Sequence, residues 1–224
     1  MLYALAISFL AFAMRLLTFD GAVAATIVGG LIWEAGKWST AIPLLMFFFS
    51  AGLISRIGKA RKKTLGLEAK PRNAIQVFAN GGPSSICAAL FLWTNEPVFF
   101  PALIGGIASA TADTWATEIG AAFGKKVFRI TTLETAVPGK SGAVSTHGII
   151  ASFFGAAFIA STASLVGRTD LIPILTTLGF FGSILDSILG DLFQDSKKTR
   201  WMTNDMVNFI SVSVITICSY FAAR

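Results

Sequence analysis

The sequence predicts an all-α integral membrane protein, a transmembrane bundle of about seven helices of which one or more are short or broken. Three observations favour this class. Of the 224 residues, 54% are hydrophobic, and the mean hydropathy is +0.70. The apolar residues form long blocks that approach the roughly 20 residues needed to cross a bilayer, and they lack the alternation of a transmembrane β-barrel. We therefore expect residues 1–224 to form a single integral membrane domain.

Eight apolar segments are the expected helices. The first follows Met1 without a basic region before it, so we expect a retained helix and not a cleaved signal peptide. The second is short, rich in glycine and flanked by Asp20 and Glu34, which fits a tilted span, a half-helix or a re-entrant piece. In order, the segments are 2–17, 21–33, 38–55, 74–93, 98–122, 143–166, 171–190 and 206–223.

The basic residues predict the orientation in the membrane. Most of them lie in loops 56–72, 123–142 and 191–204, whereas loops 94–97 and 167–170 carry few charges. If each intervening segment crosses once, the three basic loops share one side, and the positive-inside rule places that side in the cytoplasm. The C-terminus then lies on the opposite side, and the N-terminus joins it only if the second segment crosses.

The net charge of +6 follows from these loops. Contact with anionic lipid headgroups explains such charges. Nucleic-acid binding would favour aromatic residues between the basic ones, and the loops lack them. We therefore expect membrane lipids, and no nucleic acid, as partners.

Three acidic residues lie inside or at the ends of apolar segments: Asp113, Glu118 and Asp186. A carboxylate at bilayer depth costs several kcal/mol unless it is paired, hydrated or bound to a cation. Asp113 and Glu118 are about 140° apart on an ideal helix, so they border one polar arc without stacking. Gly182 and Gly190 flank Asp186, and small residues let helices approach closely. The acids are candidates for a shared site; alternatively, each bonds a neighbouring helix or lies at a wet boundary.

A second polar cluster opens the segment that begins at residue 74. Arg72, Gln76 and Asn80 share one helical face at a spacing of four. Gly81, Gly82 and Pro83 follow, and we expect them to break the helix. Such a break inside a membrane is tolerated beside protein or a water-filled cavity. The alternative is a simple kink in which Gln76 and Asn80 bond neighbouring helices.

A third cluster is the turn Gly139-Lys140-Ser141-Gly142. Its glycines permit turns that aim backbone N–H groups at phosphate oxygens, and the helix that follows would favour an anion at its N-terminus. The turn resembles the end of a P-loop, but Glu134 stands where the first glycine is required. Phosphate binding and an ordinary interfacial turn are both open.

These clusters together resemble one known family, the polytopic membrane proteins that include plastid phytyl-phosphate kinase and animal transmembrane protein 19. The matching pieces, in the family's order, are residues 72–81, 112–120, 138–145 and 182–190. This chain has Thr117 where serine commonly precedes the acid. The resemblance implies a transferase that adds a second phosphate to an isoprenoid monophosphate from a nucleoside triphosphate, with CTP among the candidates.

Under this resemblance we expect phosphoryl transfer based on charge neutralisation and alignment. Asp113, Glu118 and Asp186 are expected to bind Mg²⁺, and Lys140 joins them as a catalytic group. The acceptor is an isoprenoid phosphate whose tail stays in lipid. A transporter of an anionic or lipid-phosphate substrate and a nucleotidyltransferase acting on a lipid phosphate stay open as alternatives. The expected nucleotide- or phosphate-binding residues are Arg72, Gln76, Asn80, Gly81, Gly139, Lys140, Ser141 and Gly142.

Overall fold

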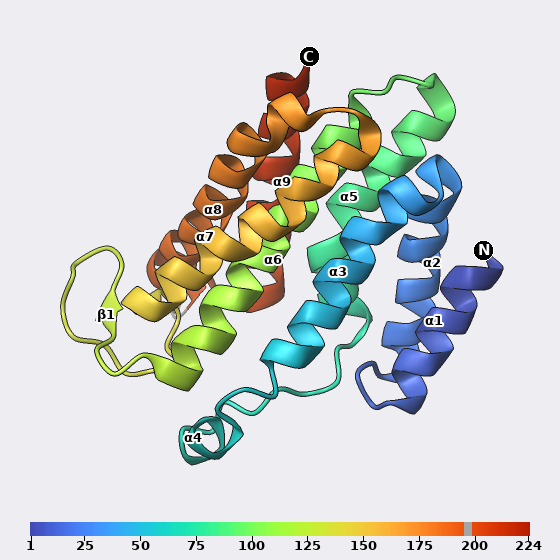
Figure 1. Ribbon diagram of the computed structural model, residues 1–224. Helices are drawn as coiled ribbons and strands as arrows, with labels where there is room; N and C mark the ends of the chain where they lie inside the picture. The colour runs from blue at the N-terminus through green and yellow to red at the C-terminus, as the bar shows by residue number, and fades with distance from the viewer. Residues whose placement is uncertain (195–198) are drawn as a thin grey trace.

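The computed structural model describes residues 1–194 and 199–224, and these residues form a bundle of α-helices (Figure 1). The prediction of an all-α polytopic membrane protein is confirmed. A two-stranded antiparallel sheet pairs β1 (Phe128–Arg129) with β2 (Ala143–Val144). The helices are α1 (Leu2–Ala13), α2 (Phe19–Gly36), α3 (Trp38–Ile54), α4 (Lys59–Thr64), α5 (Ala74–Thr94), α6 (Phe99–Phe123), α7 (Thr146–Ala160), α8 (Ile172–Leu189) and α9 (Asn204–Ala223).

Each of the eight predicted segments contains a helix. Among the described residues, four helical stretches are long and apolar enough to cross a membrane: Ala74–Thr94, Thr146–Val166, Thr169–Gln194 and Asn204–Ala223. Short 3₁₀ turns lengthen the second stretch and begin the third, and a π turn at Gly190–Gln194 extends α8. The second predicted segment, which is short and rich in glycine, is one continuous helix, α2, whose 18 residues span about 27 Å.

Helix α6 is the central element, and it packs against α3, α5, α7, α8 and α9. Small residues make this possible. A Cβ added at Gly105 would lie 2.6 Å from the Cβ of Ser219 on α9, and one added at Gly182 of α8 would lie 2.8 Å from the Cβ of Ser109 on α6. Because these backbones approach so closely, side chains of α6, α8 and α9 face one another across very short gaps.

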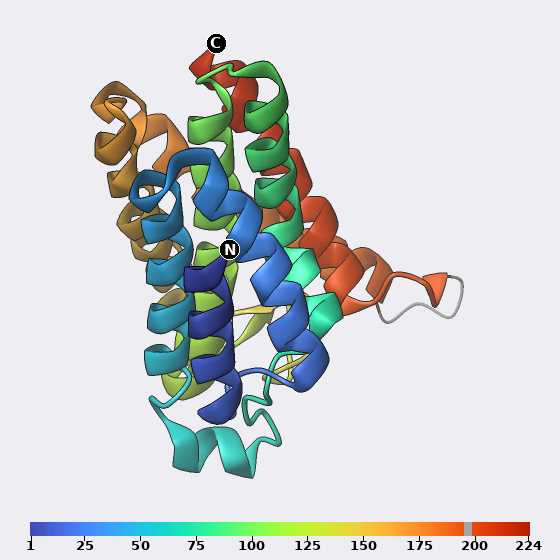
Figure 2. The same ribbon diagram turned by 90° about the vertical axis from the view of Figure 1, so that its right-hand side faces the viewer.

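The α1–α2 hairpin covers one flank of the bundle (Figure 2). The backbone of Arg72 fastens it to the segment before α5. Arg72 N–H donates to Leu16 O, and Thr18 N–H donates to Arg72 O, both at 3.0 Å. Asp20 adds a second link, since its Oδ2 accepts from the N–H of Ala74 at 2.9 Å. The start of α5 is therefore held in place by the turn between α1 and α2.

The predicted break at Gly81–Pro83 is wrong, because α5 runs without interruption through Pro83. The neighbouring helices explain why this sequence stays helical. An added Cβ at Gly81 would come within 2.9 Å of Val28 on α2, and Ser84 Oγ donates to Leu103 O of α6 at 3.0 Å. Close packing on both sides holds the helix together where Pro83 removes one backbone donor.

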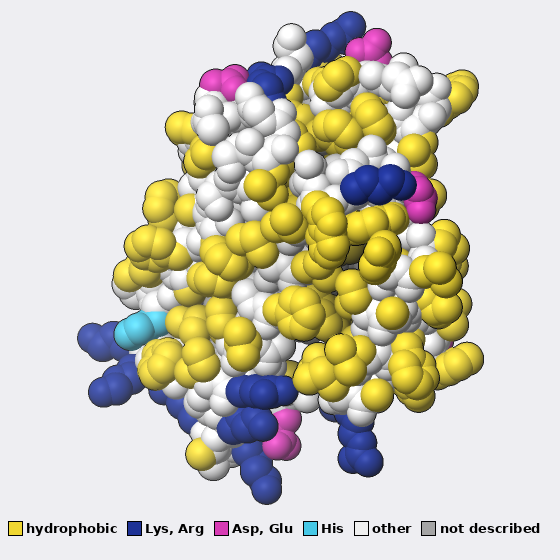
Figure 3. All heavy atoms as spheres, turned by 45° about the vertical axis from the view of Figure 1, so that its right-hand side comes forward, with side chains coloured by type: hydrophobic (Ala, Val, Ile, Leu, Met, Phe, Trp, Pro, Cys, Tyr) yellow, Lys and Arg dark blue, Asp and Glu magenta, His cyan; other side chains and the backbone are white. Residues whose placement is uncertain are grey.

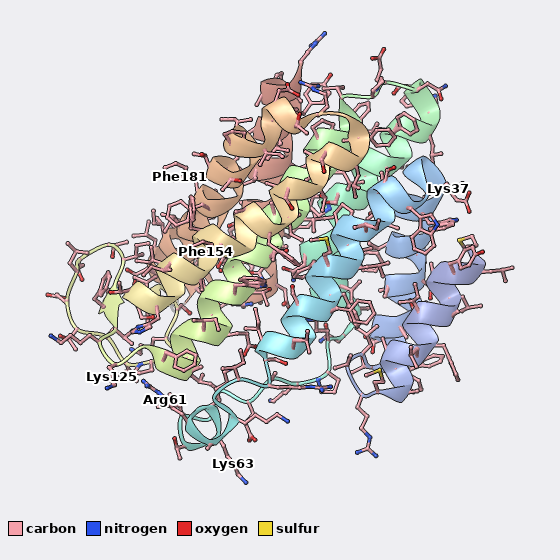
Figure 4. The ribbon with its side chains drawn as sticks, in the orientation of Figure 1. Lys37, Arg61, Lys63, Lys125, Phe154 and Phe181 are labelled. Carbon is pink, nitrogen blue, oxygen red and sulfur yellow. The ribbon has the colours of Figure 1, made fainter. Side chains whose placement is uncertain are left out.

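The basic loops gather at one end of the molecule (Figure 3). They also touch one another: Arg61 donates to Gly124 O, and Arg129 Nε donates to Asp191 Oδ1 at 2.8 Å. Lys197 and Lys198 of the third basic loop, 191–204, lie outside the described residues. Above this end the side surface is apolar, as the outward-pointing Phe154 and Phe181 illustrate (Figure 4).

The close contacts of α6 predict a specific loss of stability. Gly105→Ala should destabilise the bundle by about 1–3 kcal/mol through overpacking against Ser219. Gly52→Ala on α3 is the matched control, since an added Cβ there meets nothing within 4 Å and alanine favours helix by up to about 1 kcal/mol. Thermal unfolding of both variants in the same detergent measures the difference. Equal melting temperatures would contradict the packing role of Gly105.

Candidate functional site

A polar cavity of about 190 Å³ lies between α6, α8 and the turn before α7. Asp113 of α6 and Asp186 of α8 both line it, together with the turn 138–145. Both residues also border a second, tighter space beside this cavity. The helix contact between Gly182 and Ser109 places both carboxylates there, since Asp113 follows Ser109 and Asp186 follows Gly182 by about one helical turn. Two like charges that share an apolar bundle favour a bound cation between them.

Neutral oxygen ligands adjoin the two acids. Asn80 of α5, Ser109 of α6, and Asn208 and Ser211 of α9 line a tight space that Asp113 and Asp186 also border. Ser211 is 1% exposed, and among the described residues Asn208 Oδ1 is buried without a hydrogen-bond partner. Carboxylate, amide and hydroxyl oxygens are the donor set of a hard cation such as Mg²⁺. The residues present therefore fit the predicted metal.

The turn 139–142 forms another wall of the same cavity. Gly139 and Gly142 adopt the left-handed conformation, with φ of +84° and +71°. Asp191 lies beside the turn: its side chain is 2% exposed and pairs with Arg129 at 2.5 Å, and it accepts from both the N–H and the hydroxyl of Thr131. An added Cβ at Gly142 would lie 2.2 Å from the Cβ of Asp191. Lys140 is exposed at the rim.

Glu118 is not part of this cluster, which corrects the expected set of three metal ligands. It forms an ion pair with Lys62, whose side chain is 1% exposed. Lys62 Nζ also donates to Ser55 O at 3.2 Å, so it joins α4 to the end of α3 and to α6. Among the described residues, no three histidine, cysteine or acidic side chains lie close enough to hold a metal together. The 140° between Asp113 and Glu118 puts them on different sides of α6.

The predicted phosphate ligands in and just before α5 do not lie at one place. Arg72 and Gln76 line a separate cavity of about 520 Å³ that also contains Glu118. Gln76 in addition completes a capping box, since its Oε1 accepts from Asn73 N–H at 3.2 Å. Gly81 packs against α2, away from the acids. Asn80 is the member of this face that reaches Asp113 and Asp186.

Sequence reasoning did not identify Lys62, Asp191, Asn208 or Ser211 as site residues. Asn208 and Ser211 carry a weak signal, because they are polar residues three apart in the apolar segment 206–223. Asp191 directly follows the motif that ends at Gly190. Lys62 gives no signal, since a lysine inside a basic run is ordinarily solvated. The positions of these four residues at the two sites result from contacts between segments that are distant in the sequence.

Comparisons with known proteins find relatives that match most of the chain. An uncharacterized membrane protein of Synechocystis sp. is 32% identical over 205 residues, which cover 88% of this chain and 79% of that protein. The Arabidopsis thaliana protein PGR is 31% identical and covers 85% and 76%. Protein VTE6, a chloroplastic protein of the same plant, is 25% identical over 90% of this chain and 63% of its own length. No solved structure matches the chain.

The family comparison covers nearly the whole sequence, including all four motifs and the first two thirds of α9. The model described as integral membrane protein DUF92 matches residues 2–216. This chain therefore belongs to the DUF92 family of integral membrane proteins.

Proposed function

We propose that this protein is a membrane-embedded phosphotransferase that converts an isoprenoid monophosphate into its diphosphate with a nucleoside triphosphate and Mg²⁺. The observation that carries the proposal is the shared cavity of Asp113, Asp186 and the turn 139–142. It combines two anionic groups, which attract a cation, with backbone and lysine donors, which attract phosphate. The resemblance to the family of plastid phytyl-phosphate kinase supports the choice of acceptor.

The proposed reaction transfers the γ-phosphoryl group to an oxygen of the acceptor phosphate. The bond between the γ-phosphorus and the β–γ bridging oxygen breaks, and the nucleoside diphosphate leaves with that electron pair. The attacking oxygen is already anionic, so no strong general base is needed. The protein contributes positioning and charge stabilisation, which are the main requirements of phosphoryl transfer.

Each part of the cavity has a proposed task. Asp113 and Asp186, with Asn208 and Ser211 beside them, would hold Mg²⁺; when bound, the ion supplies neutralisation of the nucleotide phosphates. The N–H groups of the turn 139–142, with the ammonium group of Lys140, bind phosphate oxygens. Asp191 is a positioning residue, since it packs against Gly142 of the turn and does not itself line the cavity.

The basic end of the molecule is proposed to face the cytoplasm, in accordance with the positive-inside rule. Nucleotide then reaches the cavity from the aqueous side, because the turn 139–142 belongs to one of the basic loops. The isoprenoid chain approaches from the bilayer. A site at this boundary suits one substrate that is soluble in water and one that is soluble in lipid.

Removing either carboxylate should abolish turnover. Asp113→Asn and Asp186→Asn each lose half of the anionic pair, and we expect activity to fall by at least about 100-fold, as for loss of one strong transition-state contact. The assay uses purified protein, Mg²⁺, labelled CTP, GTP or ATP, and prenyl monophosphates, with product analysis for prenyl diphosphate. Glu96→Gln, an exposed acid at the opposite end of the bundle, should keep wild-type activity.

Release of pyrophosphate would show that the protein is a nucleotidyltransferase and not a kinase. Substrate flux in sealed vesicles without nucleotide consumption would show that it is a transporter. Unchanged diphosphate formation in both aspartate variants would remove these residues from the mechanism.

The turn 139–142 should be sensitive to a single methyl group. Gly142→Ala forces a Cβ into Asp191, so we expect activity to fall by about 10-fold or more through displacement of the phosphate-binding N–H groups. Gly167→Ala is the matched control: Gly167 has the same φ of +71°, but its added Cβ meets nothing within 4 Å. Thermal unfolding of both variants compares the cost of backbone strain, and wild-type activity of Gly142→Ala would exclude a specific role of the Asp191 contact.

A further inference from the structure

A second cavity at the basic end, of about 520 Å³, has a strong positive charge. It lies between the α1–α2 turn, the end of α3, α4 and the segment before α5. Lys62 and Glu118 neutralise each other within its wall. The remaining charged side chains that line it are one acid, Glu68, and five bases: Arg15, Arg56, Lys59, Lys70 and Arg72. The cavity therefore favours an anion that carries more than one negative charge.

Arg72 is the most firmly placed of these bases. Its backbone is fixed by hydrogen bonds to Leu16 and Thr18. Its guanidinium group lies over the ring of Phe47, at 5.1 Å from the centroid. In the part of the chain that the structure describes, no carboxylate lies within ion-pair distance of it. A fixed guanidinium with free donors is well suited to bind phosphate with two parallel hydrogen bonds.

An apolar chamber continues from this cavity into the helices. Its volume is about 110 Å³, and it shares Arg72, Gln76 and Phe48 with the basic cavity. Beyond these shared residues most of its walls are apolar side chains of α1, α2, α3 and α5, among them Ile7, Val28, Leu44 and Phe47, and Ser8 and Asn80 are its polar members. Trp33, near the end of α2, and Trp38, at the start of α3, line the part of the chamber that lies away from the basic cavity. The two compartments together match a molecule with an anionic head and a hydrocarbon tail.

We infer that the two connected compartments bind a phosphate monoester that carries one hydrocarbon chain. The phosphate lies at Arg72 among the other bases, and the chain lies in the apolar chamber between α1, α2, α3 and α5. As the acceptor site of the transferase this inference rests on the proposed function, although binding itself needs neither nucleotide nor Mg²⁺. Asn80 lines both the chamber and the space at Asp113 and Asp186, so the apolar chamber adjoins the proposed metal site.

The test measures binding of labelled farnesyl monophosphate to the full-length protein in uncharged detergent, with EDTA and without nucleotide. Farnesol and inorganic phosphate, which offer only the tail or only the head, should compete at least about 10-fold more weakly. Arg72→Gln should weaken binding by about 10- to 100-fold, the factor expected for a lost charge-assisted contact. Lys63→Gln is the matched control, since Lys63 is exposed on α4 and points away from the bundle (Figure 4).

A second variant tests the chamber independently of charge. Ala25 lines it on α2, and Ala25→Trp shortens the space available to the tail. This variant should weaken binding of farnesyl monophosphate and leave dimethylallyl monophosphate unaffected. Thermal unfolding, together with Arg72→Lys, which keeps the charge and should retain part of the affinity, separates loss of the site from loss of the fold.

Three results would overturn the inference. Unchanged affinity in Arg72→Gln and Ala25→Trp would exclude these compartments. Equal competition by phosphatidic acid would make the cavity a site for membrane lipid headgroups. Displacement of farnesyl monophosphate by CTP would make it the nucleotide site.

The inference and the kinase proposal can fail separately. Binding that depends on Arg72, without diphosphate formation from any nucleotide, would leave this site in place and refute the kinase. Diphosphate formation with an unchanged KM for the prenyl phosphate in Arg72→Gln would refute this acceptor site and leave the kinase proposal in place.

Discussion

The structure depends on how closely α6 approaches its neighbours. Ser109 meets Gly182, Gly105 meets Ser219, and Gly106 meets Thr216, so no large side chain separates these helices. In a membrane the hydrophobic effect does not drive helices together, so their association depends on the extensive contact that small residues allow. The same packing brings Asp113 and Asp186 to one cavity. Two negative groups cannot share an apolar interior without compensation, and the proposed cation would supply it.

The basic loops connect topology with chemistry. As a set they fit the positive-inside rule, and many of their lysines are exposed. Individual members, however, have defined structural tasks. Lys62 is buried with Glu118, Arg61 donates to the carbonyl that ends α6, and Arg129 is paired with Asp191. These contacts tie the three loops into one layer across the end of the bundle, and the cavity walls are made from that layer.

Much of the fold could be predicted from the sequence, because bilayer thickness and the absence of water restrict what apolar segments can do. Asp113 and Asp186 could be identified in the same way, from the cost of burying a charge. Burial of Glu118 carries the same cost, but its partner Lys62 lies 56 residues away in the sequence, so no local sequence pattern predicts the ion pair. The break expected at Pro83 failed for a related reason: α2 and α6 support this part of α5, and their contribution depends on tertiary contacts that local propensity does not contain.

The two cavities explain why the polar face of α5 is divided. Arg72 and Gln76 face the basic cavity and the apolar chamber, whereas Asn80 also reaches the two aspartates. A phosphate monoester bound at Arg72 would be separated from a nucleotide at the turn 139–142 by α6 along most of its length. The apolar chamber and the space at the two aspartates share Asn80, one turn of α5 beyond Gln76, so the phosphate would have to move from Arg72 towards Asn80 before transfer. Until that movement the acceptor would stay in the basic cavity and the apolar chamber, and the nucleotide in the polar cavity, so each substrate would stay in surroundings that suit it.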